Sequence, residues 1–219
     1  MPVRLRSACA LAIVLLLGGC HSADDWSDPR AEATPVGALG PGFVDPSAPP
    51  SPEATITPSP GSWDAVQPPK GYRVVLLTAG DDPQTKTLVT AVREWATADK
   101  VSLKTVEAPG DYVSRIDEAI NLKPDLIISA GNALVDPLAL VTASHLDQQF
   151  LVVGAELAEP TTNVTAATWP GASYRGKGLG TSTAYDPKSF TPARATAAIR
   201  AGVAGVLSHV TGVVIWLKL

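Results

Sequence analysis

Cysteine, methionine and histidine are scarce in this chain of 219 residues, which contains two, one and three of them. Cysteine nucleophiles and metal sites built from cysteine or histidine therefore have little raw material. Acidic residues outnumber basic ones by 21 to 17, and a net charge of −4 argues against a nucleic-acid-binding protein, which needs a basic surface. The chain also has no Gly-x-Ser-x-Gly, His-Glu-x-x-His or Walker motif. We expect no metal, no cofactor and no enzymatic activity.

Long apolar runs are also missing, because the longest one is the ten-residue stretch from Ala8 to Leu17. As a helix it would measure about 15 Å, half the thickness of a bilayer core, so it has the length of a secretory signal and not of a membrane span. Arg4 and Arg6 precede it, and Leu17-Gly18-Gly19-Cys20 follows. This ending resembles the bacterial lipobox, in which the cysteine receives a lipid and becomes the new N-terminus; an ordinary signal peptide is the alternative.

The lipobox reading predicts a signal peptide over residues 1–19 and a lipid on Cys20. The protein would then be extracytoplasmic and anchored to the bacterial cell membrane by its N-terminal lipid. Loss of Arg4 and Arg6 takes the net charge from −4 to −6. Cys9 leaves with the signal and Cys20 carries lipid, so the mature protein would have no thiol and no disulfide.

Proline is concentrated in one segment: eleven of the twenty prolines lie between His21 and Lys70. This segment shows neither helical nor strand periodicity and has few apolar residues to offset the cost of ordering it. The composition predicts a lipid-anchored, proline-rich disordered linker over residues 20–70. Its aromatic residues are either docking anchors or exposed side chains near the membrane, and the composition favours the second interpretation; they are Trp26, Phe43 and Trp63.

From Gly71 onward, apolar strands alternate with amphipathic helices. Strands are expected in six runs: 72–77, 101–106, 124–129, 150–153, 164–169 and 213–217. Helices are expected after Asp82-Pro83, after Asp111, around Pro137 with Asp136 as its cap, and after Thr191-Pro192.

This alternation predicts an α/β fold with an open, mostly parallel sheet and helices on both faces. Residues 71–219 would form a single lobe of the periplasmic-binding-protein-like or flavodoxin-like kind. In such sheets, ligands bind beyond the carboxyl ends of the strands. The candidate ligand-binding residues are those that follow the strands, together with two from the glycine-rich stretch 170–190: Thr78, Gly80, Asp81, Ser129, Gly131, Asn132, Glu156, Tyr174 and Arg175.

Two other interpretations of these residues remain open. Turns between strands and helices need glycine, asparagine and aspartate whatever the function, so each position can be purely structural. An enzymatic interpretation instead requires that Asp81, Glu156 and Arg175 meet in one acid–base cluster.

Several segments resemble, in this order, the basic membrane protein family of lipoproteins, which are nucleoside-binding components of ABC importers. They are Val74–Thr78, Asp111–Ala119, Pro124–Gly131, Asp147–Val153, Asn163-Val164, Arg200–Leu207 and Thr211–Ile215. Members of that family have two lobes, and only the first is expected here. This chain has Ala79, and Gly154-Ala155-Glu156, where the family usually has an aspartate.

The resemblance implies a membrane-anchored protein that binds a nucleoside or other small polar solute for import through an ABC permease. A dimer or another protein would have to supply the wall that the second lobe provides. The alternative is an envelope interaction or scaffold lipoprotein that uses the same lobe to dock a protein partner.

Overall fold

The computed structural model describes residue 26, residues 31–172, 174–181 and 183–219. The expected signal peptide and the lipidation site Cys20 lie outside these residues. The strands are β1 (Thr55–Ile56), β2 (Arg73–Thr78), β3 (Ser102–Glu107), β4 (Leu126–Ala130), β5 (Phe150–Val153), β6 (Val164–Thr168) and β7 (Val214–Trp216).

These seven strands form one sheet in the order β1-β7-β6-β5-β4-β2-β3, and every neighbouring pair is parallel. The chain runs from β2 to β3 on one side and then adds β4 to β7 in turn on the other side. Five of the strands, in the order β3-β2-β4-β5-β6, match flavodoxin-like folds, and β7 and β1 extend the sheet at the β6 edge. The expected α/β fold with an open parallel sheet is confirmed.

The longer helices begin where their capping residues predict. Asp82 accepts from the Thr85 amide, and Thr191 from the Arg194 amide. The helices are α1 (Pro83–Ala98), α2 (Tyr112–Asn121), α3 (Val135–Val141) and α4 (Pro192–Leu207), with 3₁₀ turns at Asn132–Leu134, Thr142–Ser144 and Pro187–Ser189. None of the helices in the described part of the chain is long and apolar enough to cross a membrane.

Asp136 does not cap α3 as the sequence predicts. The helix begins one residue earlier, at Val135, directly after the 3₁₀ turn, and no side chain caps it. Asp136 lies in the first turn, and its carboxylate accepts the Lys177 amide at 3.0 Å. The aspartate thus holds a distant loop instead of its own helix end.

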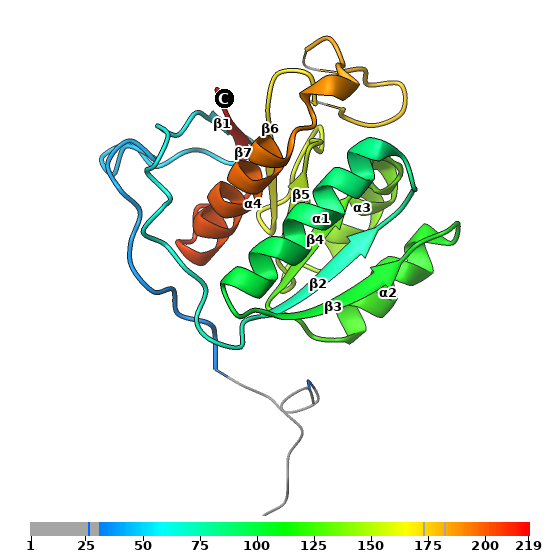
Figure 1. The fold of residues 1–219 in the computed structure, drawn as a ribbon, viewed down its shortest axis with the longest axis horizontal. Helices are drawn as coiled ribbons and strands as arrows, with labels where there is room; N and C mark the ends of the chain where they lie inside the picture. Colours follow the sequence, from blue (N-terminus) through cyan, green and yellow to red (C-terminus); the bar gives the residue numbers. More distant parts are fainter. Residues whose placement is uncertain (1–25, 27–30, 173, 182) are drawn as a thin grey trace, which may run out of the picture.

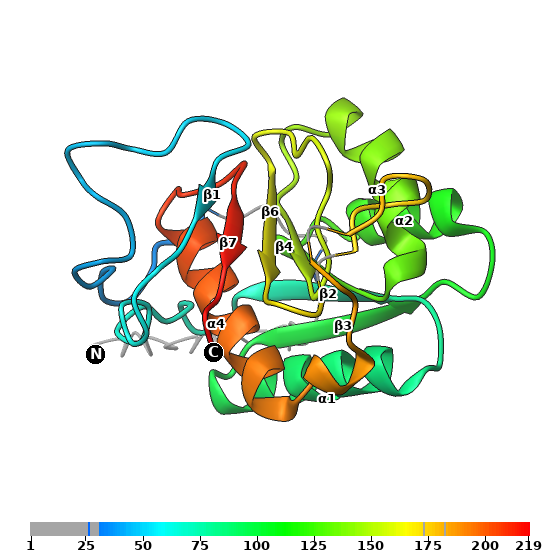
Figure 2. The same ribbon diagram turned by 90° about the horizontal axis from the view of Figure 1, so that it is seen from above.

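The helices cover the sheet in two layers (Figures 1 and 2). α1 and α4 pack side by side on one face, and α2 and α3 on the other. Strand residues alternate between the two cores: Leu76 and Ile128 contribute to the first, whereas Leu77 and Ile127 contribute to the second. Both faces are therefore dry, as a parallel sheet requires.

Small residues let α4 approach the sheet closely. A Cβ atom at Gly202 would lie 2.4 Å from Leu151 Cδ1, and one at Gly205 would lie 3.2 Å from Ile215 Cδ1. The alanine-rich sequence of α4 is thus explained by packing against β5 and β7.

Residues 31–70 are folded, which differs from the disordered linker expected from their composition. This segment, called the arm below, crosses the α1–α4 side of the sheet and adds β1 to the outer edge of β7 (Figure 2). Phe43 is 2% exposed and Trp63 is 5% exposed, and both belong to the same core as α1 and α4. Backbone hydrogen bonds of 2.9 Å in both directions join Val36 to Gln67.

A few large side chains explain why the arm orders despite its prolines. Burial of one aromatic side chain contributes about 2–3 kcal/mol, and proline lowers the entropy that the unfolded arm loses. Composition averaged over fifty residues does not detect anchors spaced about twenty residues apart. All three aromatics of the predicted linker are buried, so the prediction of exposed aromatics is wrong.

Trp26 anchors the start of the chain at the opposite edge of the sheet, beside β3. Its ring is 5% exposed, and its Nε1 donates to Ser102 Oγ at 3.1 Å. The Lys104 ammonium lies 4.4 Å and the Arg73 guanidinium carbon 5.9 Å from ring centroids of Trp26. Arg73 also donates to the Trp26 carbonyl at 3.1 Å.

Replacement of Phe43 by alanine should destabilise the protein, because it empties a site in the main core. The expected loss is about 3 kcal/mol of unfolding free energy, measured by urea denaturation of the chain from residue 21 onward. Val36→Ala is the matched control, because Val36 is 57% exposed in the same arm. Equal stability of the two variants would show that the arm does not contribute to the fold.

Candidate functional site

The carboxyl ends of β2 and β4 lie next to each other at the point where the strand order reverses. Thr78 pairs with Ala130 there. Two loops continue from these ends, the first through Gly80 and Asp81 to α1 and the second through Gly131 and Asn132 to α3. Flavodoxin-like sheets bind ligands at this position.

The two loops touch each other across the switch point. Gly131 has a φ of 119°, and a Cβ atom there would lie 2.2 Å from the Ala79 carbonyl oxygen. Glycine is therefore required at position 131, for both its backbone conformation and the close approach.

Above Gly131 lies a crevice of about 270 Å³, called the switch-point crevice below. Its walls come from the start of α1, the loop after β4 and the end of the stretch 170–190. Asn132 hydrogen-bonds Tyr185 through its side chain, and Phe190 packs edge-on against Trp169 at a centroid distance of 5.2 Å. The lining residues are Asp82, Gln84, Thr85, Leu88, Gly131, Asn132, Tyr185 and Phe190.

The environment of Tyr185 favours its neutral phenol. Burial raises the pKa of Tyr185 above its ordinary value of 10.0, and the negative charge of Asp82 raises it further, whereas the hydrogen bond to Asn132 opposes the rise. A neutral hydroxyl can both donate and accept. Tyr185 can therefore hydrogen-bond a polar ligand in the crevice at neutral pH.

A larger hollow of about 510 Å³ lies beside it, between α1 and the end of β3, and is called the α1–β3 hollow below. The candidate residues Thr78, Gly80 and Asp81 all line it. The remaining wall residues were not among the predicted site residues, because they come together only where α1 lies beside the end of β3. Those residues are Ala79, Thr85, Lys86, Val89, Arg93, Glu107, Ala108, Pro109 and Tyr112.

Thr78 provides a polar group in this hollow that the fold leaves unused. Its side chain is 9% exposed, and its hydroxyl oxygen is buried without a hydrogen-bond partner in the described chain. Its backbone carbonyl is occupied by the Ala108 amide at 2.8 Å. A buried unpaired hydroxyl costs about 1–3 kcal/mol, which a ligand that hydrogen-bonds it would recover.

Ser129 lines neither of these two hollows. It is 2% exposed within β4, where it pairs with Leu77 and Val152. These two neighbours belong to the core on the α2–α3 side of the sheet. The predicted role of Ser129 in ligand binding finds no support in this position.

Glu156, Tyr174 and Arg175 form a separate cluster after β5. The Glu156 carboxylate is buried and lies 3.6 Å from Arg175 Nε, and backbone bridging joins Ala155 to Tyr174. Burial raises the pKa of the Tyr174 phenol, and the charge of Asp136 raises it further. This cluster ties the glycine-rich stretch to the sheet.

The structure does not assemble the acid–base cluster that an enzymatic interpretation requires. Glu156 and Arg175 meet, but no hydrogen bond or ion pair in the described chain joins Asp81 to either of them. Asp81 instead lines the α1–β3 hollow. Among the described residues, no group of three or more histidine, cysteine, aspartate or glutamate side chains could hold a metal ion.

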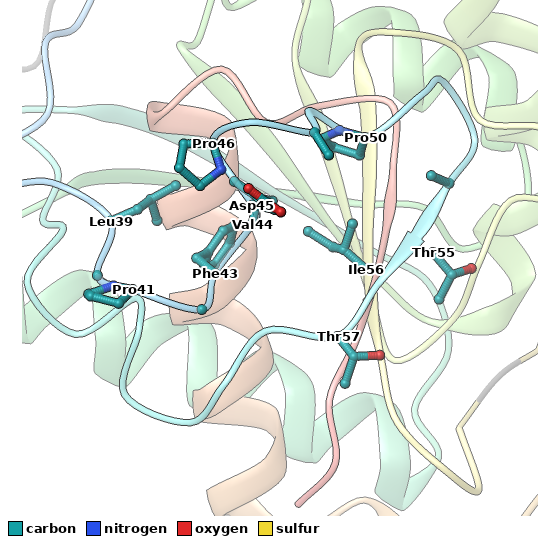
Figure 3. Close-up of a pocket in the computed structure, with 14 residues that line it drawn as sticks. Leu39, Pro41, Phe43, Val44, Asp45, Pro46, Pro50, Thr55, Ile56 and Thr57 are labelled. Carbon is teal, nitrogen blue, oxygen red and sulfur yellow. The ribbon is translucent and has the colours of Figure 1, made fainter.

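A third hollow, the arm groove, lies within the arm, between residues 39–50 and β1, and measures about 870 Å³ (Figure 3). Leu39, Phe43, Val44 and Ile56 give it an apolar surface, and Ile56 points into the loop whereas Thr57 points away. It lies far from the carboxyl ends of β2 and β4, at the opposite edge of the sheet.

Comparison with solved structures finds solute-binding proteins and a lipoprotein. The ABC transporter solute-binding protein of Aeropyrum pernix K1 is 19% identical over 45% of this chain and 29% of its own, with a TM-score of 0.40. That of Conexibacter woesei DSM 14684 is 16% identical over 45% of this chain and 35% of its own, with a TM-score of 0.38. A fragment of a predicted lipoprotein from Peptoclostridium difficile 630 is 20% identical over 44% of this chain and 84% of that fragment, with a TM-score of 0.40.

The match therefore spans about a third of the length of the two solute-binding proteins. No family model and no curated protein matches the chain. The fold assignment rests on the sheet order and its two helix layers.

Tyr185 should ionise at a higher pH than an ordinary tyrosine, and its ionisation can be followed by phenolate absorbance at 295 nm. Because its folded-state pKa lies above the unfolded value, the unfolded chain loses this proton first. The contribution to stability is complete below about pH 10 and decreases as the pH rises through the folded-state pKa.

We expect Tyr185→Phe to remove the part of the phenolate absorbance that appears at the highest pH. The free energy of unfolding should then decrease less steeply above pH 10. Tyr174→Phe is the comparison, because the pKa of Tyr174 is raised without contact to Asn132. A Tyr185 component at or below pH 10 would contradict the described environment.

Proposed function

We propose that this protein is a membrane-anchored, extracytoplasmic solute-binding-like lipoprotein, and that its α/β domain takes a small polar solute at the carboxyl edge of the sheet. The observation that carries this proposal is the α1–β3 hollow, with a buried, unpaired Thr78 hydroxyl and four charged side chains along its walls. A hollow of about 510 Å³ has the size of ordinary small-molecule sites.

Binding without chemistry fits this site better than catalysis. The hollow contains no histidine and no cysteine, and Tyr112 is the only tyrosine in its wall. The resemblance of the sequence to basic membrane protein lipoproteins supports a nucleoside or another small polar solute as ligand and an ABC permease as partner. The class of ligand, the ABC permease partner and the absence of enzymatic activity are all part of this proposal.

Lipidation of Cys20 would hold the domain close to the membrane. A disordered linker over residues 20–70, as the composition predicts, would instead let the domain move far from it. Five residues separate Cys20 from the buried Trp26, and even a fully extended chain from one to the other spans only about 20 Å. If Trp26 were released, the next backbone anchor would be Val36, which allows about 55 Å. Trp26 therefore sets the distance between membrane and domain.

We expect Trp26→Ala to move the lipidated protein away from a bilayer. The mature chain has no other thiol, so a dye on Asp117→Cys, an exposed position in α2, can report energy transfer to a labelled lipid. Transfer should fall on release of Trp26 and stay unchanged in Val36→Ala. Equal transfer in all three proteins would show that Trp26 does not limit the distance.

A second candidate function is that of an envelope interaction module, and the arm groove favours it. The groove is the largest of the hollows described, and its apolar lining suits a protein segment better than a polar solute. In this interpretation the sheet serves as a scaffold, and the arm supplies the contact.

Thermal-shift and calorimetric titration with nucleosides, sugars and amino acids tests the first function against the second. Stabilisation by one class, lost in Thr78→Val, is the expected result. Thr78→Val keeps the shape of the side chain and removes the unpaired hydroxyl, so the free variant should be as stable as the wild type or slightly more so. If no small ligand binds, and if cross-links to a protein partner form only at the arm groove, the interaction module would be favoured.

A further inference from the structure

The α1–β3 hollow is lined by two positively and two negatively charged side chains. Lys86 and Arg93 belong to α1, and Val89 lies between them on the same helix face, at spacings of three and four residues. Asp81 follows β2, and Glu107 ends β3. The hollow therefore has a cationic wall from α1 and an acidic wall from residues at the ends of β2 and β3.

These charges are not used within the described fold. The described ion pairs join Arg115 to Glu118, Arg175 to Glu156 and Arg200 to Asp64, and none includes a charged residue of the hollow. Two cations and two carboxylates in one hollow balance each other in number. A ligand with a net charge of either sign would leave one wall without a partner, whereas a ligand with both charges would satisfy both walls.

Part of the remaining lining of the hollow is apolar. Val89, Ala108, Pro109 and the Tyr112 ring line this part of the hollow. The buried Thr78 hydroxyl lies on the strand side and is without a partner in the described chain. The hollow therefore combines a cationic wall, an acidic wall, an apolar surface and one free hydroxyl.

We propose that the α1–β3 hollow binds a small zwitterion, namely a free amino acid or a dipeptide with an apolar side chain. Its carboxylate would contact Lys86 and Arg93, and its ammonium group Asp81 and Glu107. The apolar side chain would pack on Val89 and Tyr112. This inference rests on the proposed solute-binding function and names the class of solute.

The hollow has room for such a ligand, and the neighbouring switch-point crevice differs in chemistry. The crevice measures about 270 Å³ against about 510 Å³ for the hollow, and its lining includes Asp82 but no lysine or arginine. The Asp82 carboxylate is already occupied, since it accepts from both the Thr85 amide and the Thr85 hydroxyl. A ligand carboxylate would find no counter-charge there.

Calorimetric titration of the chain from residue 21 onward with L-leucine, leucyl-leucine, leucinamide, N-acetyl-leucine and uridine tests the proposal. Leucinamide lacks the carboxylate, and N-acetyl-leucine lacks the ammonium group. We expect leucine or its dipeptide to bind, and each derivative that lacks one charge to bind at least about tenfold more weakly.

Charge-neutralising variants then locate the site. Arg93→Gln and Glu107→Gln should each weaken binding of the zwitterion about three- to tenfold. Arg93→Gln should reduce the preference for leucine over leucinamide, and Glu107→Gln the preference for leucine over N-acetyl-leucine. Lys188→Gln and Glu94→Gln are matched controls, because these exposed residues do not line the hollow, and both should bind within twofold of wild type.

The outcomes separate this inference from the proposed function. Binding of uridine without binding of leucine or its dipeptide would overturn the inference and leave the solute-binding function intact. Binding of leucine that Arg93→Gln and Glu107→Gln do not change would place the ligand outside the hollow and overturn the inference as well. Failure of every probe, with all variants folded, would overturn both.

Discussion

A sheet in which every described strand is parallel cannot leave a face open to water, and the rest of this structure depends on that constraint. Four helices provide most of the cover, with α1 and α4 on one face and α2 and α3 on the other. They do not complete it on the first face, beside α4 and β7. The arm fills this gap with Phe43 and Trp63 and extends the sheet by β1. A segment with the composition of a linker is thus part of the core.

The same constraint determines where binding can occur. Each parallel crossover returns the chain to the same end of the sheet, so the loops after β2, β3 and β4 gather at one edge. At the switch point itself, Gly131 brings two of these loops into contact, so that open space remains on either side of the junction. The α1–β3 hollow contains four charged groups outside the described ion pairs and an unpaired hydroxyl, whereas Glu156 and Arg175 beyond β5 form an ion pair with each other at 3.6 Å. The α1–β3 hollow is therefore the stronger candidate site, because its charged groups are outside the described ion pairs and available to a ligand.

Much of the fold could be predicted from the sequence, because its signals are local. Apolar runs of five or six residues identify the buried strands, and Asp82-Pro83 and Thr191-Pro192 mark two helix starts. The arm could not be predicted this way, because its order depends on tertiary contacts of Phe43 and Trp63 with helices more than a hundred residues away. The same limit applies to the site. Thr78, Gly80 and Asp81 were identifiable as residues after a strand, but Lys86 and Arg93 become site residues only once α1 lies beside the end of β3.

Trp26 would couple the proposed lipid anchor to the fold. Its ring packs beside β3 between two cations, and its indole nitrogen and its carbonyl are both hydrogen-bonded. Cation–π contacts of this kind contribute about 0.5–1 kcal/mol each, and burial of the indole contributes more. An N-terminal lipid would pull on this contact before any other part of the domain, because the chain from Cys20 reaches Trp26 first. The β3 edge would then be the part of the domain nearest the membrane, and the arm groove, at the β1 edge of the same sheet, would be turned away from it. A partner in the arm groove and a lipid at the N-terminus would therefore not compete for the same side of the molecule.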